Sequence, residues 1–166
     1  MKTNRRQFLR TTMLGAVGVA AAGVAPAVVS PRVFGSPQSA APSDRIRLGF
    51  IGVGNRGGQN LDAFLGLPDR ADIVALCDVD ASYLANALNK VKEKSQRSCA
   101  TYGDYRKLLE NNDVDAVVIS TPDHWHALHS IDACKAGKDV YVEKPISTSI
   151  AEGRAMVQAA RKYKRI

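Results

Sequence analysis

The stretch IRLGFIGVGNRG, residues 46–57, contains the pattern that decides the fold. Residues 46–52 are mostly apolar and predict a buried strand. The pattern GxGxxG begins where that strand ends, as Gly52-Val53-Gly54-Asn55-Arg56-Gly57. An apolar stripe with helical spacing follows at Leu61, Phe64 and Leu65. A strand, a glycine-rich turn and a helix in this order predict the first unit of an α/β fold.

The rest of the chain repeats this alternation. Further strands are expected at 72–78, 100–102, 115–121 and 139–143, and helical patterns lie between and after them, the last at 149–164 with Ile150 and Val157 facing inward. Strands that are apolar throughout indicate a parallel sheet with helices on both faces. We therefore predict a Rossmann-like, doubly wound sheet, which binds ligands beyond the carboxyl ends of its strands.

The three glycines of the motif have separate expected roles. Gly52 permits a tight turn, Gly54 allows the backbone to approach a pyrophosphate, and Gly57 allows close packing of helix on strand. The helix that begins here presents free N–H groups and the positive end of its dipole to the phosphates. A glycine-rich turn without a ligand is the simpler alternative, but the strand before and the helix after favour a dinucleotide site.

An acidic residue ends the second strand, about 20 residues beyond the last glycine of the motif. Asp78 is expected there to bind the adenosine ribose hydroxyls, and its carboxylate repels a 2′-phosphate, which favours NAD over NADP. Arg56 argues the other way, because a guanidinium binds phosphate. Asp80 is the alternative ribose partner, or simply the N-cap of the next helix.

The fourth strand leads into TPDHWHALH, residues 121–129. Three histidines suggest a metal, but His124 and His126 do not share a helix face and no nearby acid completes a ligand set. No metal site is therefore predicted. The histidines are expected to shape the nicotinamide or substrate pocket, and Trp125 is interpreted as a core residue.

The fifth strand ends in VYVEKP, residues 140–145. A charged pair at a strand end is often only solvated. Here it lies at the same sheet edge as the glycine turn, so the Lys144 ammonium is placed to hydrogen-bond a substrate oxygen and to transfer its proton during hydride transfer. Glu143 is expected to orient Lys144 or to contact the nicotinamide ribose, and Pro145 to hold the turn.

The net charge of +7 comes mostly from the first part of the chain. Residues 1–41 contribute +5 with no acid, and the remainder only +2. No basic stripe is interleaved with aromatic residues, which argues against nucleic-acid binding. Three cysteines without CxxC spacing are expected to be small buried residues, although one pair could form a disulfide.

The basic N-terminus reads as a targeting segment. The adjacent pair Arg5-Arg6, followed by a mildly apolar stretch rich in Ala and Gly, resembles a twin-arginine (Tat) export signal over residues 1–30. An ordinary secretory signal and an uncleaved membrane anchor are the alternatives. Residues 31–44 are predicted to be a linker and 45–166 the dinucleotide-binding domain, in a periplasmic protein that touches the membrane only through export or an uncleaved signal.

GVGNRG, CDVD, TPDHWHA, AGKDVYVEKP and STSIAEGRAMV together resemble the Gfo/Idh/MocA oxidoreductase family, over about residues 45–166. The resemblance implies oxidation or reduction of a sugar or polyol with tightly held NAD(P), and Lys144 matches the family's catalytic lysine. It also implies a dinucleotide site at Gly52, Gly54, Asn55, Arg56, Gly57 and Asp78, and a nicotinamide half approached by Thr121, Pro122, His126 and Glu143.

The family also has a second domain that binds the sugar. The sequence leads us to expect a Rossmann domain truncated before its last strand and before that domain, and a homo-oligomer if full length. Two alternatives stay open. One is an NAD-dependent glycosidase that uses transient oxidation at C3, against which the intact Glu-Lys-Pro argues. The other is a non-catalytic NAD-binding fragment.

Overall fold

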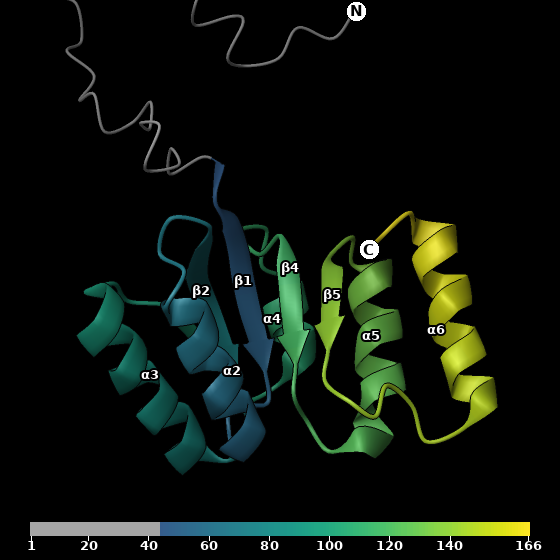
Figure 1. Cartoon of the computed structure of the whole chain (residues 1–166), viewed down its shortest axis with the longest axis horizontal. Helices are drawn as coiled ribbons and strands as arrows, with labels where there is room; N and C mark the ends of the chain where they lie inside the picture. The colour runs from purple at the N-terminus through teal and green to yellow at the C-terminus, as the bar shows by residue number, and fades with distance from the viewer. Residues whose placement is uncertain (1–43) are drawn as a thin grey trace, which may run out of the picture. The chain divides into compact units, whose positions relative to one another are not determined.

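The computed structural model describes residues 44–166, so the predicted export signal and nearly all of the predicted linker lie outside the described residues. The described part alternates between strands and helices (Figure 1). Its elements are β1 (Ile46–Ile51), α2 (Asn55–Leu65), β2 (Ala71–Cys77), α3 (Ala81–Ser95), β3 (Ala100–Tyr102), α4 (Tyr105–Leu109), β4 (Ala116–Ile119), the 3-10 turn η3 (Asp123–Trp125), α5 (His126–Lys135), β5 (Asp139–Val142) and α6 (Ile150–Tyr163).

The five strands form one parallel sheet in the order β3-β2-β1-β4-β5. The chain builds the sheet outward from β1 in one direction to β3, and then starts again on the other side of β1 with β4. Ligands of such sheets bind at this switch, outside the carboxyl ends of the strands. The predicted Rossmann-like α/β fold is confirmed.

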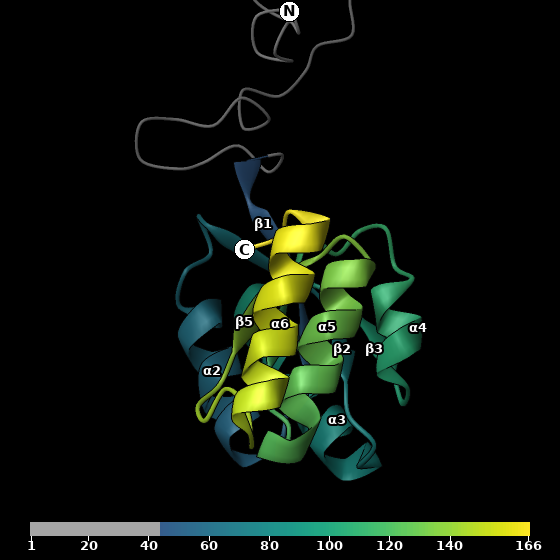
Figure 2. The same cartoon turned by 90° about the vertical axis from the view of Figure 1, so that its right-hand side faces the viewer.

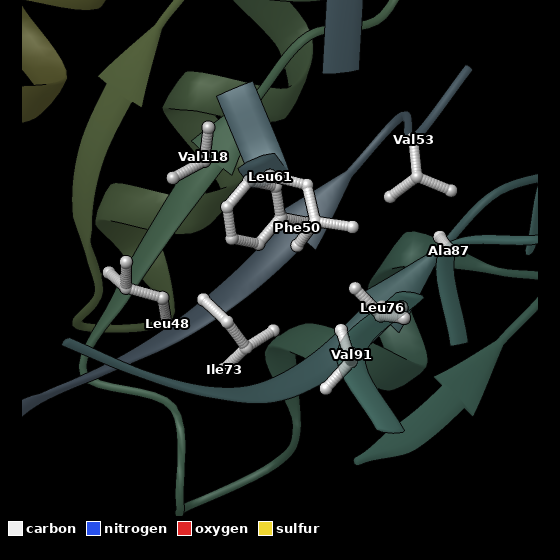
Figure 3. Packing of buried hydrophobic residues seen from close by; sticks show 9 residues of the cluster. All are labelled: Leu48, Phe50, Val53, Leu61, Ile73, Leu76, Ala87, Val91 and Val118. Atoms are coloured by element: carbon white, nitrogen blue, oxygen red, sulfur yellow. The ribbon is translucent and has the colours of Figure 1, made fainter. Parts of the chain in front are cut away.

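Helices cover both faces of the sheet, and each face has its own core. Phe50 of β1 packs with Leu61 of α2 and Val91 of α3 on one face, and this cluster is drawn in Figure 3. Ile51, the next residue along β1, packs with Leu108 of α4 on the other face. Figure 2 shows α2 on one side and the pair α4 and α5 on the other. Because successive side chains of a strand point to opposite faces of the sheet, β1 contributes residues to both cores.

The last helix differs from the sequence-based expectation. Ile150 and Val157 were expected to face inward, but they are 83% and 49% exposed. The helix α6 packs against α5 at the β5 edge of the sheet, and the residue it buries is Ala159. A side chain between two helices must be small for their axes to come close, so the alanine is buried and the larger residues are not.

Beyond α6 the chain turns back toward the sheet. The Val140 N–H donates to the carbonyl of Ile166 over 2.8 Å, and the Ile166 N–H donates to Asp139 Oδ1 over 2.9 Å. Residue 166 therefore lies along the outer edge of β5. Within residues 44–166 no helix combines the length and the apolarity that a membrane crossing requires.

Candidate functional site

A cleft with a volume of about 770 Å³ lies at the carboxyl ends of the strands. It is bounded by the turn after β1, by Asp78 after β2, and by residues 120–122 after β4. Gly103 and the start of α4 close it on the β3 side. This is the position at which an open parallel sheet binds its ligand.

The glycine turn is shaped by two contacts that exclude a side chain. Gly52 has φ +84°, and a Cβ there would lie 2.9 Å from the backbone of Ser120 and Thr121. A Cβ on Gly57 would lie 2.1 Å from the carbonyl oxygen of Gly52. The tight turn expected at Gly52 and the close packing expected at Gly57 are both present, and they bring the start of α2 against the end of β1.

The N-terminus of α2 has no side-chain cap. Gly54 is its N-cap residue and supplies no side-chain hydrogen bond, so the first N–H groups of the helix, those of Asn55 and Arg56 among them, face the cleft entrance. A Cβ on Gly54 would lie 2.9 Å from the ring of Tyr83. The backbone at this point therefore passes close to an aromatic side chain.

Asp78 stands at the centre of the turn between β2 and α3. Its Oδ2 accepts the Val53 N–H over 2.8 Å, and its Oδ1 accepts the Asp80 N–H over 3.0 Å. Each oxygen keeps a lone pair for a further donor such as a ribose hydroxyl. Asp80 instead caps α3 by accepting from the N–H groups of Ser82 and Tyr83, and the Ser82 hydroxyl, which also donates to it, together with these N–H groups holds its pKa below the usual range. The capping alternative for Asp80 is the one that the structure shows.

Glu143, at the end of β5, is a buried carboxylate held from the α2 side. Its Oε2 accepts from Asn60 Nδ2 over 3.0 Å and from Arg56 Nε over 2.7 Å, and its Oε1 accepts the Lys144 N–H over 3.0 Å. Asn60 and Arg56 lower the pKa of Glu143 to about 2. The Glu143 carboxylate thus links Arg56 of the glycine turn to the backbone N–H of Lys144.

The position of Arg56 bears on cofactor choice. Its guanidinium is bound to Glu143 at the β5 end of the sheet, and it also donates to Gln59 over 2.9 Å. Two strands, β1 and β4, separate β5 from β2, where Asp78 lies. Arg56 is therefore held away from the place where a 2′-phosphate would sit.

Lys144 is exposed and joined to Pro145 by a cis peptide bond. Neither Lys144 nor Glu143 is among the residues that line the cleft, whereas Thr121 and Pro122 are. The catalytic role of Lys144 stays a prediction. What the structure shows is an exposed lysine whose preceding residue, Glu143, is bound to Arg56, a residue of the cleft wall.

The three histidines occupy three different environments. His124 is exposed, and His126 is buried outside the cleft. His129 lines the cleft, with its ring stacked on Trp125 at 5.5 Å and 4.3 Å from the Tyr105 ring. Burial lowers the pKa of His129 to about 4, so its ring is neutral at physiological pH.

One interpretation of this segment needs correction, and the role of His126 stays a prediction. Trp125 is 44% exposed in the cleft wall, so the core interpretation is wrong. It is the N-cap residue of α5 and stacks on His129 about one turn later, with the His124 ring 5.8 Å away. His126, expected beside the nicotinamide, is only 1% exposed and does not line the cleft. Its two ring nitrogens both contact backbone carbonyls.

Sequence reasoning missed the wall formed after β3. Asp104 caps α4 by accepting the Arg106 N–H over 3.0 Å, and the Arg106 guanidinium lies 5.2 Å from the Tyr105 ring centre. All three residues line the cleft. The signal was present, because they follow a strand whose carboxyl end lies at the same edge, but that strand has only three residues.

One cysteine, Cys77, is among the residues that line the cleft. Cys77 and Cys134 are buried, and all three cysteines are free thiols. Burial raises the pKa of the Cys77 thiol to about 12, which keeps it protonated and unreactive. Within residues 44–166 no three metal-ligating side chains come together.

Comparisons with known proteins agree with this geometry. Residues 46–166 match the Gfo/Idh/MocA model, described as an oxidoreductase family with an NAD-binding Rossmann fold. Among solved structures, the WlbA dehydrogenase of Chromobacterium violaceum, in complex with NADH and UDP-GlcNAcA, is 29% identical with a TM-score of 0.67, over 76% of this chain and 35% of that one. The myo-inositol 2-dehydrogenase of Lactobacillus plantarum is 25% identical with a TM-score of 0.63, over 74% and 35%.

The curated relatives have a different name. A glycosyl hydrolase family 109 protein of Shewanella pealeana is 34% identical over 173 residues, which span 96% of this chain and 37% of that protein. One from Shewanella baltica is 30% identical over 169 residues. The chain thus spans little more than a third of the length of these relatives.

Proposed function

The chain belongs to the Gfo/Idh/MocA oxidoreductase family through its NAD-binding Rossmann domain, and from this premise we propose that it is the cofactor domain of an enzyme that transfers hydride between NAD and a sugar or polyol. The observation that carries the proposal is the arrangement along one sheet edge. An uncapped helix start and the Asp78 carboxylate border one cleft of about 770 Å³, and the residue before Lys144 is bound to Arg56 of the cleft wall.

The residues present fit a dinucleotide. The N–H groups at the start of α2 suit the pyrophosphate, and Asp78 has acceptor capacity left for two ribose hydroxyls. Bound NAD would supply the hydride acceptor. Asp78 repels a 2′-phosphate while Arg56 is held by Glu143 at the far strand, and together these contacts support NAD over NADP.

The proposed role of Lys144 is to hold a proton at the substrate oxygen. Its ammonium extends from a turn whose preceding residue, Glu143, is fixed by Asn60 and Arg56. A substrate hydroxyl that is oxidised must lose its proton as the hydride leaves carbon, and an amine at this edge is placed to exchange that proton. Thr121 and Pro122 line the wall between this turn and the glycine turn.

The glycosidase alternative is favoured by the names of the curated relatives. Both functions need the same first step, oxidation of a sugar carbon by NAD, so the cofactor site does not separate them. Release of a leaving group from a chromogenic glycoside, with no net NADH formed, would favour the glycosidase. Net NADH formed from a free sugar or polyol, and abolished in Lys144→Met with NAD binding retained, would favour the dehydrogenase.

Calorimetric titration of the full chain tests the cofactor proposal. We expect saturable binding of NAD+ and at least about tenfold weaker binding of NADP+, a difference of about 1.4 kcal/mol. Asp78→Asn removes the charge while keeping an acceptor oxygen. It should therefore reduce the ratio of the NADP+ to the NAD+ dissociation constant, mainly by improving NADP+ binding. Asp69→Asn is a charge-matched control outside the lining residues. Equal binding of both cofactors, or of neither, would contradict the proposal.

A further inference from the structure

His126 is the most buried histidine in the chain, with 1% of its surface exposed at the start of α5. Its Nδ1 lies 2.7 Å from the carbonyl oxygen of Pro145, and its Nε2 lies 2.8 Å from the carbonyl oxygen of Thr121. The ring therefore bridges two loops at the same sheet edge. One loop follows β4 and lines the cleft, and the other follows β5 and contains Lys144.

The chemistry of these two contacts restricts the protons on the ring. A carbonyl oxygen only accepts hydrogen bonds, so each ring nitrogen must donate. A neutral imidazole has one N–H, and its other nitrogen would direct a lone pair at a carbonyl oxygen less than 3 Å away. Both contacts are satisfied only when both nitrogens bear hydrogen, since an unpaired buried polar atom is costly.

The surroundings supply charges of both signs. Asp123 and His124 lie in η3, on the chain just before His126, and His129 and Asp132 lie on α5 itself. From the β5 side come the Lys144 ammonium and the carboxylate of Glu143, which is ionised at neutral pH. Burial lowers the pKa of His129 to about 4, and the Asp132 carboxylate opposes that shift.

We propose that His126 carries a hydrogen on both ring nitrogens at neutral pH and acts as a positioning residue for Lys144, tying its turn to the cleft wall at Thr121. The two neighbours of Lys144 are then both fixed. Glu143 is held through its carboxylate by Asn60 and Arg56, and Pro145 is held through its carbonyl by His126. The importance of this position for catalysis rests on the proposed function, but the bonding of the ring does not.

The chain has three histidines, and they provide internal controls for a direct measurement. The full chain is labelled with 15N-histidine, and long-range 1H–15N correlations are recorded at pH 7, with peaks assigned from His→Gln variants. We expect two protonated nitrogens for His126. His129, whose pKa is lowered to about 4, should show one protonated and one bare nitrogen and serves as the internal control. A bare ring nitrogen on His126 at pH 7 would overturn the proposal.

Hydrogen exchange tests the positioning role. The Lys144 amide donates to Glu143 Oε1, so it reports on the turn. In His126→Gln, whose single amide nitrogen cannot reach carbonyls on both sides, this amide should exchange about tenfold faster, while amides of the buried strand β2 keep their rates. His124→Gln is the matched control and should change neither. An unchanged Lys144 rate in a folded His126→Gln would refute the positioning role. Failure to bind NAD would count against the proposed function and leave both of these results standing.

Discussion

Gly57 and Gly58 are adjacent in the first turns of α2, but their surroundings differ. A Cβ on Gly57 would lie 2.1 Å from the Gly52 carbonyl oxygen, whereas on Gly58 it would lie 3.4 Å from the nearest atom, the Val53 carbonyl oxygen. We expect Gly57→Ala to lower the free energy of unfolding by at least ~3 kcal/mol, because β1 and α2 must separate. Gly58→Ala is the control and should be neutral or stabilising by up to about 1 kcal/mol. Denaturant titration measures both, and equal effects would contradict the contact at Gly57.

Glu143 makes a pH-dependent contribution to stability whose direction follows from its pKa. The pKa is lowered from 4.5 to about 2 by Asn60 and Arg56. A carboxyl with a depressed pKa in the folded state stabilises the fold above its unfolded pKa and loses that contribution as the pH falls through the folded value. The free energy of unfolding should therefore fall less steeply between pH 4.5 and 2 in Glu143→Gln than in the natural sequence.

Glu110→Gln is the control for that comparison, because Glu110 is exposed and is bound only by Lys107 over 3.3 Å. Other carboxylates with lowered pKa values, such as Asp62 and Asp115, contribute to both curves and cancel in the difference. If the free energy of unfolding falls equally with pH in Glu143→Gln and in the natural sequence, the carboxylate is not held by Asn60 and Arg56 as described.

At this scale the sequence predicted residue types better than their contacts. The glycine pattern and Asp78 were found because they follow a strand at fixed spacing. Trp125 was misread because a tryptophan next to a helix start is apolar whether it lies in the core or lines a cleft. The contact of His126 with the Pro145 carbonyl was not predicted, because only the fold brings the two together across 19 residues of sequence.

Lys138 directly precedes β5 and links it to the segment between α4 and β4. Its buried Nζ donates to the carbonyls of Asn111 and Val114, each over 2.8 Å, and burial holds its pKa below the usual range. Lys138→Met keeps most of the volume but removes both bonds, which leaves the Asn111 carbonyl with the Val114 N–H alone and the Val114 carbonyl without this donor, so it should cost about 2 kcal/mol of unfolding free energy. Lys135→Met removes only an exposed pair with Asp132 and should cost under about 0.5 kcal/mol. Equal costs in thermal or denaturant unfolding would contradict the bonding of Lys138.

Elements were predicted more reliably than their packing. Every strand and helix expected after residue 45 is present, because apolar runs and helical stripes are local signals. The buried face of α6 was not predicted correctly, since it depends on which neighbours the helix has. With α5 as its main partner, the helix buries Ala159 and leaves Ile150 exposed.

The whole molecule joins a basic N-terminal segment to a nearly neutral domain, and the basic segment contains the predicted export signal. Because twin-arginine signals depend on the arginine pair, Arg5→Lys together with Arg6→Lys should retain the protein in the cytoplasm. Lys2→Arg is a control that keeps the charge and the pair. Cell fractionation with an antibody against the chain measures this, and unchanged export of the double variant would exclude a twin-arginine route.

We propose that NAD binds in the cleft at the carboxyl ends of β1, β2 and β4, with its adenosine half toward β2 and its nicotinamide half toward β4. A crystal structure of the chain grown with NAD+ tests it most directly. We predict electron density for the pyrophosphate at the start of α2, for the adenosine ribose at Asp78, and for the nicotinamide on the side of Thr121 and Lys144. Density in the reverse direction, or an empty cleft at saturating NAD+, would contradict the account.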